Sequence, residues 1–86
     1  MSATINKVSA SFTIVELGDF TIWFSYRTPI AFDDGHQFVI RRNEWGPTTG
    51  KHLNIADGGR GAERIDGDEF KRKLDDAISH FVMRGV

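Results

Sequence analysis

Alternating hydrophobic and polar positions in residues 11–42 are typical of β-structure. β-branched and aromatic residues fill segments 12–17 and 20–26, and the Gly18-Asp19 pair between them suits a two-residue hairpin turn. This turn sets Leu17 opposite Phe20. The apolar positions then share one face, which we expect to be the core face: Val15, Leu17, Phe20, Ile22, Phe24 and Tyr26.

A second hairpin is predicted from residues 28–32 and 36–41, with Asp33-Asp34-Gly35 as its loop. A two-residue loop would set Phe32 opposite Gln37 and mix apolar with polar residues on both faces. A three-residue loop with Gly35 in the left-handed region sets Phe32 opposite His36 instead. We predict the second register because it gathers the apolar set on one face: Ile30, Phe32, Phe38 and Ile40.

The C-terminal segment 66–84 is predicted to be a helix. Asp66 is the expected N-cap, and Glu69 three residues later completes a capping box. Apolar residues at helical spacing form one stripe: Phe70, Leu74, Ala77, Ile78, Phe81 and Val82. We expect this stripe to pack on the core face of the sheet.

These elements predict a single domain of the α+β class spanning residues 1–86. Its architecture would be a four-stranded antiparallel meander, two hairpins within residues 11–42, with one C-terminal helix packed on one face. Residues 1–10 are expected to form a loosely ordered lead-in.

The stretch 43–65 is expected to be a long polar loop, because it is rich in glycine and polar residues. Structureless connections of this length are uncommon in compact domains and are often functional. Thr48 could also cap a short helix over residues 49–56, which Gly50 opposes. Both interpretations stay open on the sequence alone.

Composition narrows the function classes. The 86 residues include 11 Lys+Arg and 12 Asp+Glu, for a formal charge of −1, which argues against sequence-blind binding to duplex nucleic acid. The absence of cysteine excludes a disulfide scaffold, a thiolate metal site and a cysteine nucleophile, and fits a reducing cytoplasm. No apolar run approaches the roughly 20 residues that cross a bilayer. We therefore expect a cytoplasmic protein without a membrane partner.

The segment Gly46–His52 superficially resembles a phosphate-binding loop. Three residues rather than four separate its glycines, and His52 replaces the hydroxyl residue that would hold magnesium, so nucleotide hydrolysis is not expected. A weaker anion-binding turn around Lys51 remains an alternative. Thr49, His52 and Asp57 offer the residue types of a catalytic triad, but closeness in sequence says nothing about geometry.

The three histidines, His36, His52 and His80, are too scattered for a recognisable metal-ligand spacing. The polar residues of the long loop are more simply explained as partners for its backbone groups. We therefore predict no catalytic residue, no metal and no cofactor.

Trp23 and Trp45 carry more information about function. In the predicted register Trp23 points away from the core face, so the second face of the sheet is half apolar. Either residues 43–65 fold back over this face with Trp45 as a plug, or the face binds a protein, with a tryptophan as hot spot and arginines at the rim.

Two segments, Tyr-Arg-Thr-Pro-Ile-Ala-Phe at 26–32 and Trp-Gly-Pro-Thr-Thr-Gly-Lys-His-Leu-Asn at 45–54, resemble a pattern in small uncharacterised proteins of phages and other mobile elements. The resemblance implies a short accessory protein without an assigned catalytic residue. Proteins of that kind often bind and block a host or defence component, as anti-CRISPR proteins do.

The leading hypothesis is therefore a non-enzymatic binding or inhibitor protein that occupies a surface of a host or defence protein. One alternative is a single-stranded nucleic-acid-binding module, and another is a small anion-binding or hydrolytic protein centred on residues 48–52. A homodimer through strand edges or the Trp23 face is compatible with each. The expected partner-binding residues are Trp23, Arg41, Arg42, Trp45, Lys51, His52 and Arg60.

Overall fold

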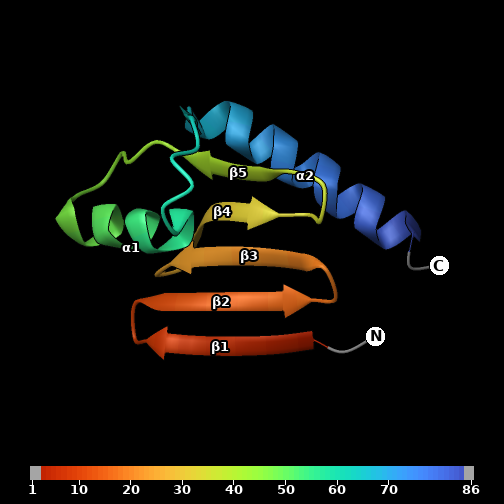
Figure 1. The fold of residues 1–86 in the computed structure, drawn as a ribbon, viewed down its shortest axis with the longest axis horizontal. Helices are drawn as coiled ribbons and strands as arrows, with labels where there is room; N and C mark the ends of the chain where they lie inside the picture. The colour runs from red at the N-terminus through yellow and green to blue at the C-terminus, as the bar shows by residue number, and fades with distance from the viewer. Residues whose placement is uncertain (1–2, 85–86) are drawn as a thin grey trace.

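The computed structural model describes residues 3–84, which form one six-stranded sheet with a helix on each face (Figure 1). The strand order is β1-β2-β3-β4-β5-β6; the first five strands are antiparallel neighbours, and β6 runs parallel to β5. The elements are β1 (Ala3–Ser9), β2 (Phe12–Leu17), β3 (Phe20–Ser25), β4 (Thr28–Asp33), β5 (Phe38–Arg41), α1 (Pro47–Asp57), β6 (Arg64–Ile65) and α2 (Gly67–Arg84).

The α+β class and the antiparallel character of the sheet are confirmed, whereas the expected four strands and one helix are too few. The expectation of a lead-in over 1–10 is wrong for residues 3–9, which form β1. Its two large apolar residues, Ile5 and Val8, are both exposed, so β1 is held by pairing with β2 more than by burial. An element held in this way leaves little hydrophobic pattern in the sequence.

The first hairpin has the predicted register. Leu17 pairs with Phe20 around Gly18-Asp19, and Gly18 has a φ of 63°, in the left-handed region that this tight turn requires of its first residue. Phe20 and Ile22 lie in the buried core on the α2 side of the sheet, as the alternation indicates.

The predicted register of the second hairpin is wrong. Phe32 pairs with Val39 rather than His36, so the connection contains four residues, 34–37. The Asp34 carboxylate stabilises it by accepting hydrogen bonds from the backbone N–H groups of His36 and Gln37, both at 2.9 Å. The prediction assumed one apolar face, but both faces of β4 and β5 are covered.

A bulge in β4 lets the strand serve both faces. The register shifts between Trp23 and Phe24 of β3, so that Ile30 is the extra residue on β4. Ile30 and its neighbour Ala31 both enter the core on the α1 side, whereas Phe32 enters the core on the α2 side. The α2-side core contains Phe20, Ile22, Phe32, Val39, Phe70, Leu74 and Ala77; the α1-side core contains Phe12, Ile30, Ala31, Ile40, Leu53 and Ala56.

The C-terminal helix begins as predicted, with the Asp66 carboxylate accepting a hydrogen bond from the N–H of Glu69 at 2.9 Å. Its stripe is only partly buried, because Phe70, Leu74 and Ala77 are covered while Ile78 and Val82 are exposed. The C-terminal end of α2 projects beyond the ends of the strands (Figure 1), which explains why the last part of the stripe finds no sheet to cover it.

Residues 43–65 are not one long loop, because α1 occupies the middle of the segment. Of the two open interpretations the short helix is correct, but it starts at Pro47, a favoured residue for a first helical turn, and its N-cap is Gly46 rather than the expected Thr48. Gly58 ends the helix in the left-handed region with a φ of 60°. Leu53 and Ala56 bury the helix on the second face of the sheet, so the expectation of a helix on one side alone is wrong.

Candidate functional site

The seven partner-binding residues expected from the sequence lie in several places. Trp23 is half-buried on the α1 side of the sheet, where its ring lies edge-on to Phe38 with centroids 5.6 Å apart. The Arg60 guanidinium lies over the same two rings, 5.9 Å from Trp23 and 4.2 Å from Phe38. Trp23 and Arg60 thus lie together as part of the intramolecular packing beneath the loop that follows α1.

Arg42 and Lys51 are exposed. The backbone N–H of Arg42 donates to the carbonyl of Ile65 at 2.8 Å, and its Nε donates to the carbonyl of Arg64 at 3.3 Å. Arg42 therefore helps to join β5 to β6, while Lys51 extends from the outer side of α1.

His52 is buried in a polar cluster that we call the Ser25 cluster: Ser25, Thr49 and His52. The Ser25 hydroxyl lies 2.7 Å from His52 Nδ1 and 3.1 Å from the Thr49 hydroxyl. The His52 ring also stacks on Phe12, with centroids 4.8 Å apart and planes at 21°. The cluster hydrogen-bonds α1 to β3 inside the apolar core, which satisfies the buried polar groups there.

The catalytic set considered from the sequence, Thr49, His52 and Asp57, does not form around Asp57. The Asp57 carboxylate instead accepts hydrogen bonds from the backbone N–H groups of Gly61 at 2.8 Å and Ala62 at 3.1 Å. These two hydrogen bonds, with the nearby charges of Arg64 and Arg60, lower the pKa of Asp57 below its ordinary value, although desolvation opposes the change. Asp57 therefore closes the loop after α1.

We expect this hydrogen bonding to make stability depend on pH. Because the pKa of Asp57 is lower in the folded chain than in the unfolded chain, its contribution is present above the unfolded value of about 4 and is lost as pH falls through the folded value. Asp57→Asn should flatten this acid-side loss in denaturant titrations at a series of pH values. If Asp57→Asn leaves the slope of unfolding free energy against pH unchanged, the role given to Asp57 is contradicted. Asp76→Asn, at an exposed position, is the matched control.

Trp45 lines a small pocket between the β3–β4 turn and α1, which we call the aromatic cleft. Its volume is about 180 Å³, and Trp45 and Tyr26 line it with 51% and 59% of their surfaces exposed. The other lining residues are Ser25, Thr28, Ile30 and Thr49. The cleft thus combines two exposed aromatic rings with a hydroxyl-bearing wall.

Trp45 is held in place by Arg41, a residue that is itself largely buried. The Arg41 guanidinium lies 4.6 Å from the Trp45 ring and 5.7 Å from the Phe70 ring, and its Nη2 donates to the Glu44 carboxylate at 2.8 Å. Such a cation–π contact favours one position of the indole. Gly67 lies beside it, and a Cβ at that position would collide with the guanidinium, which would then have to shift.

The backbone of Trp45 is fixed as well. Its N–H donates to the Asn43 side-chain oxygen at 3.0 Å, while the Asn43 amide donates to the carbonyl of Gly46 at 3.0 Å. Asn43 therefore bridges both sides of Trp45 and sets the path into α1. Trp45 does not plug the second face of the sheet, contrary to one interpretation of the sequence, since half of its surface is exposed.

Tyr26 has an unusual backbone conformation, with a φ of 57°. Left-handed backbone is uncommon for an aromatic residue and tends to cluster at functional sites. Its N–H donates to the carbonyl of Ser11 at 2.7 Å, which extends the β2–β3 pairing into the turn. The turn thus holds Tyr26 beside the cleft while leaving its ring exposed.

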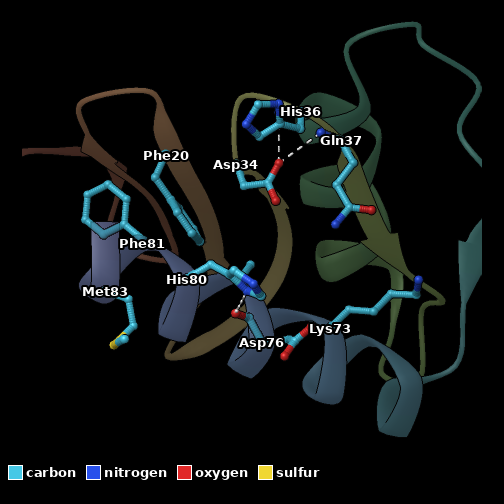
Figure 2. A pocket seen from close by; sticks show the side chains of 10 residues that line it. Phe20, Asp34, His36, Gln37, Lys73, Asp76, His80, Phe81 and Met83 are labelled. Carbon is cyan, nitrogen blue, oxygen red and sulfur yellow. Dashed lines mark hydrogen bonds between the residues drawn. The ribbon is translucent and has the colours of Figure 1, made fainter. Parts of the chain in front are cut away.

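A larger and more open groove, of about 700 Å³, lies between α2 and the β4–β5 connection (Figure 2). Phe20, Phe81 and Met83 form its apolar end, while Asp34, His36, Gln37, Lys73, Asp76 and His80 give the rest mixed polarity. Partial burial acts to raise the pKa of Asp34. The hydrogen bonds that its carboxylate accepts from the N–H groups of His36 and Gln37 act the other way and lower this pKa below its ordinary value. His80 Nδ1 donates to the Asp76 carbonyl at 3.0 Å, since a carbonyl can only accept. None of the seven partner-binding residues expected from the sequence lines this groove.

Two broader features concern residues 3–84 as a whole. Within this range no three or more acidic, histidine or cysteine side chains are grouped as metal ligands would be. Neither helix, over its described length, combines the length and apolar character that crossing a membrane requires.

Comparison with known proteins places the chain without naming an activity. No curated protein and no solved structure gives a significant match. A family model described as "Family of unknown function (DUF8033)" matches residues 2–72, which include every residue that lines the aromatic cleft. The match covers most of the chain, and the protein therefore belongs to this family of unknown function.

Proposed function

We propose that the protein is a non-enzymatic binding protein that captures a segment of a partner protein in the aromatic cleft. The observation that carries the proposal is the half-exposed Trp45. The Arg41 guanidinium packs on its ring, and the exposed Tyr26 lines the same cleft. Tryptophan, tyrosine and arginine dominate the residues that supply most of the binding energy in protein interfaces.

The contacts around Trp45 also favour binding. Immobilising a large side chain on binding costs free energy, and a ring that is already held in position avoids much of this cost. Arg41 holds the Trp45 ring and Asn43 holds its backbone, so Trp45 is preorganised for contact. Arg41 thus acts by positioning Trp45, while the exposed Lys51 and Arg42 remain available to acidic groups of a partner.

The class of partner is proposed from the resemblance to accessory proteins of phages and mobile elements. The partner would then be a host or defence protein, and the captured segment would belong to a surface that this partner needs for its own work. The cleft lies within residues 2–72, the segment that the family model matches.

The proposal can be tested without knowing the partner, by selecting binders from a random peptide library with the wild-type protein as bait. We expect selected peptides to lose affinity for Trp45→Ala by at least about 30-fold, the equivalent of a hot-spot loss of about 2 kcal/mol. Met83→Ala is the matched control, because Met83 is also exposed but lies in the groove beside α2. Affinities are measured by titration calorimetry.

The two variants separate the outcomes. Loss of affinity in Trp45→Ala with retention in Met83→Ala supports the cleft as the binding surface. The opposite pattern would move the binding surface to the groove, and a library that yields no binder would contradict the proposal. Circular dichroism confirms that both variants keep the fold.

One observation favours a second candidate function, a small hydrolase. Ser25 lines the cleft, and its 2.7 Å contact with His52 Nδ1 is the hydrogen bond of a nucleophile and its base. Against it, only 2% of Ser25 is exposed, and the His52 ring packs against the Phe12 and Tyr26 rings. Labelling of the wild type, but not of Ser25→Ala, by a fluorophosphonate would favour the hydrolase.

A further inference from the structure

The outer edge of β1 is a free strand edge. β1 is the first strand in the sheet order and pairs on one side with β2; among residues 3–84 no strand pairs with its other side. In Figure 1 both described helices lie towards the other end of the sheet, away from β1. A free edge presents unpaired N–H and C=O groups that another strand can use.

Apolar side chains accompany this edge. Ile5 is 69% exposed, although it continues a cross-strand row with Val15 and Ile22 on the α2 side of the sheet. Ile22 is buried, Val15 is half-buried and Ile5 is exposed, so the row loses its cover step by step towards the edge. A strand added beyond β1 would cover Ile5 and complete the row.

A bulge limits the part of the edge that can pair. The register between β1 and β2 shifts between Lys7 and Ser9, which interrupts the regular strand at Val8. The regular edge therefore runs over residues 3–7, and its midpoint is Ile5. A two-fold axis that pairs this segment with itself passes through its midpoint, so Ile5 sets the register.

We propose that β1 pairs antiparallel with β1 of a second copy of this chain, around a two-fold axis at Ile5. The two Ile5 side chains then lie opposite one another and join two apolar rows into one. Thr4 faces Asn6 of the second copy, so polar side chains meet. Lys7 lies opposite residue 3 in this register, so the two lysines do not lie directly opposite one another. The two sheets become one continuous sheet.

Self-complementarity favours a second copy over an unrelated strand. A two-fold axis at Asn6 would set Ile5 opposite Lys7 and Thr4 opposite Val8, pairing apolar with charged or polar side chains. The register at Ile5 instead sets Ile5 opposite itself and Thr4 opposite Asn6, and an isologous interface requires a segment that matches itself in this way. The inference goes beyond the proposed function, because the aromatic cleft is built from β3, β4, α1 and the segment before α1.

The absence of cysteine makes a direct test available. We expect Ile5→Cys to cross-link into a covalent dimer under mild oxidation, because opposite residues of an antiparallel pair have Cα atoms about 4.5–5.5 Å apart and a disulfide joins Cα atoms about 4.4–6.8 Å apart. In a mixture of Thr4→Cys and Asn6→Cys chains, the disulfide between the two different variants should form faster than the disulfide between two identical chains, because residue 4 lies opposite residue 6. Val82→Cys on α2 is the exposed control.

Sedimentation equilibrium completes the test. Wild-type protein should associate as a dimer and Ile5→Lys should be monomeric, with the same circular dichroism spectrum because Ile5 is exposed within the monomer. A monomeric wild type would overturn the inference. So would Ile5→Cys cross-linking no faster than Val82→Cys. Neither outcome affects the peptide selection that tests the aromatic cleft.

Discussion

His52→Ala is expected to destabilise the fold by about 3–5 kcal/mol, the range for truncating a buried aromatic ring. The His52 ring is 7% exposed, stacks on Phe12 and hydrogen-bonds the Ser25 hydroxyl at 2.7 Å. The substitution removes the contacts of α1 with Phe12 of β2 and with Ser25 of β3. Since small domains have unfolding free energies of about 5–15 kcal/mol, much of the total is lost. Urea unfolding measures the difference.

Neighbouring substitutions show whether the ring or the hydrogen bond matters more. Ser25→Ala keeps the ring but leaves His52 Nδ1 without this partner, which should cost about 1–3 kcal/mol. Lys51→Ala, the exposed neighbour on α1, should change stability by less than about 0.5 kcal/mol. A His52→Ala protein as stable as Lys51→Ala would contradict a structural role for the Ser25 cluster.

Phe32→Ala should be comparably destabilising, by about 3–5 kcal/mol. Phe32 is fully buried and joins the sheet to α2, with its ring centroid 6.0 Å from Phe20 and 5.8 Å from Phe70. Truncation leaves a cavity between the Phe20 and Phe70 rings, and rigid rings collapse poorly into such a space. Thermal and urea unfolding followed by circular dichroism provide the measurement.

The control for this substitution is His36→Ala. The register predicted from the sequence would pair His36 with Phe32, whereas the structure pairs Val39 with Phe32 and leaves His36 exposed in the connection. His36→Ala should therefore leave stability nearly unchanged, while Val39→Ala should destabilise the protein. A large effect at His36 together with a small one at Val39 would contradict the observed register.

Elements determined by local physics could be predicted from the sequence. The Gly18-Asp19 turn fixes the first hairpin because few residues tolerate the conformation that its first position requires. The Asp66 N-cap and the apolar spacing after it define α2 for a similar reason, since a cap and a helical stripe are both local patterns. These features needed no knowledge of distant segments.

Elements that depend on distant packing could not be predicted in the same way. The register of β4 and β5 was misjudged because α1 buries the second face, and a sheet buried on both faces loses its alternation. α1 itself contains Gly50, which disfavours a helix, and tertiary contacts through Leu53 and Ala56 override this preference. β1 left no pattern because its side chains are mostly exposed.

The candidate site was found only in part from the sequence. Trp45 stands out by residue type, and its exposure makes it suitable for binding, but Trp23 and His52 are taken up by internal packing. Ser25 was missed because its partners Thr49 and His52 lie 24 and 27 residues away, so no local motif joins them. The exposed Tyr26 lies beside Trp45 only in the folded chain, and no local motif indicates this arrangement.

The most direct test of capture in the aromatic cleft is fluorine NMR of protein labelled with fluorotryptophan. The chain has two tryptophans, one in the cleft and one outside it, and each gives its own resonance. When a selected peptide is added, we expect the Trp45 resonance to shift in proportion to binding while the Trp23 resonance, shielded beneath Arg60 and Phe38, stays in place. Trp45→Phe assigns the two signals. Saturable binding that shifts only Trp23, or neither tryptophan, would contradict capture in the aromatic cleft.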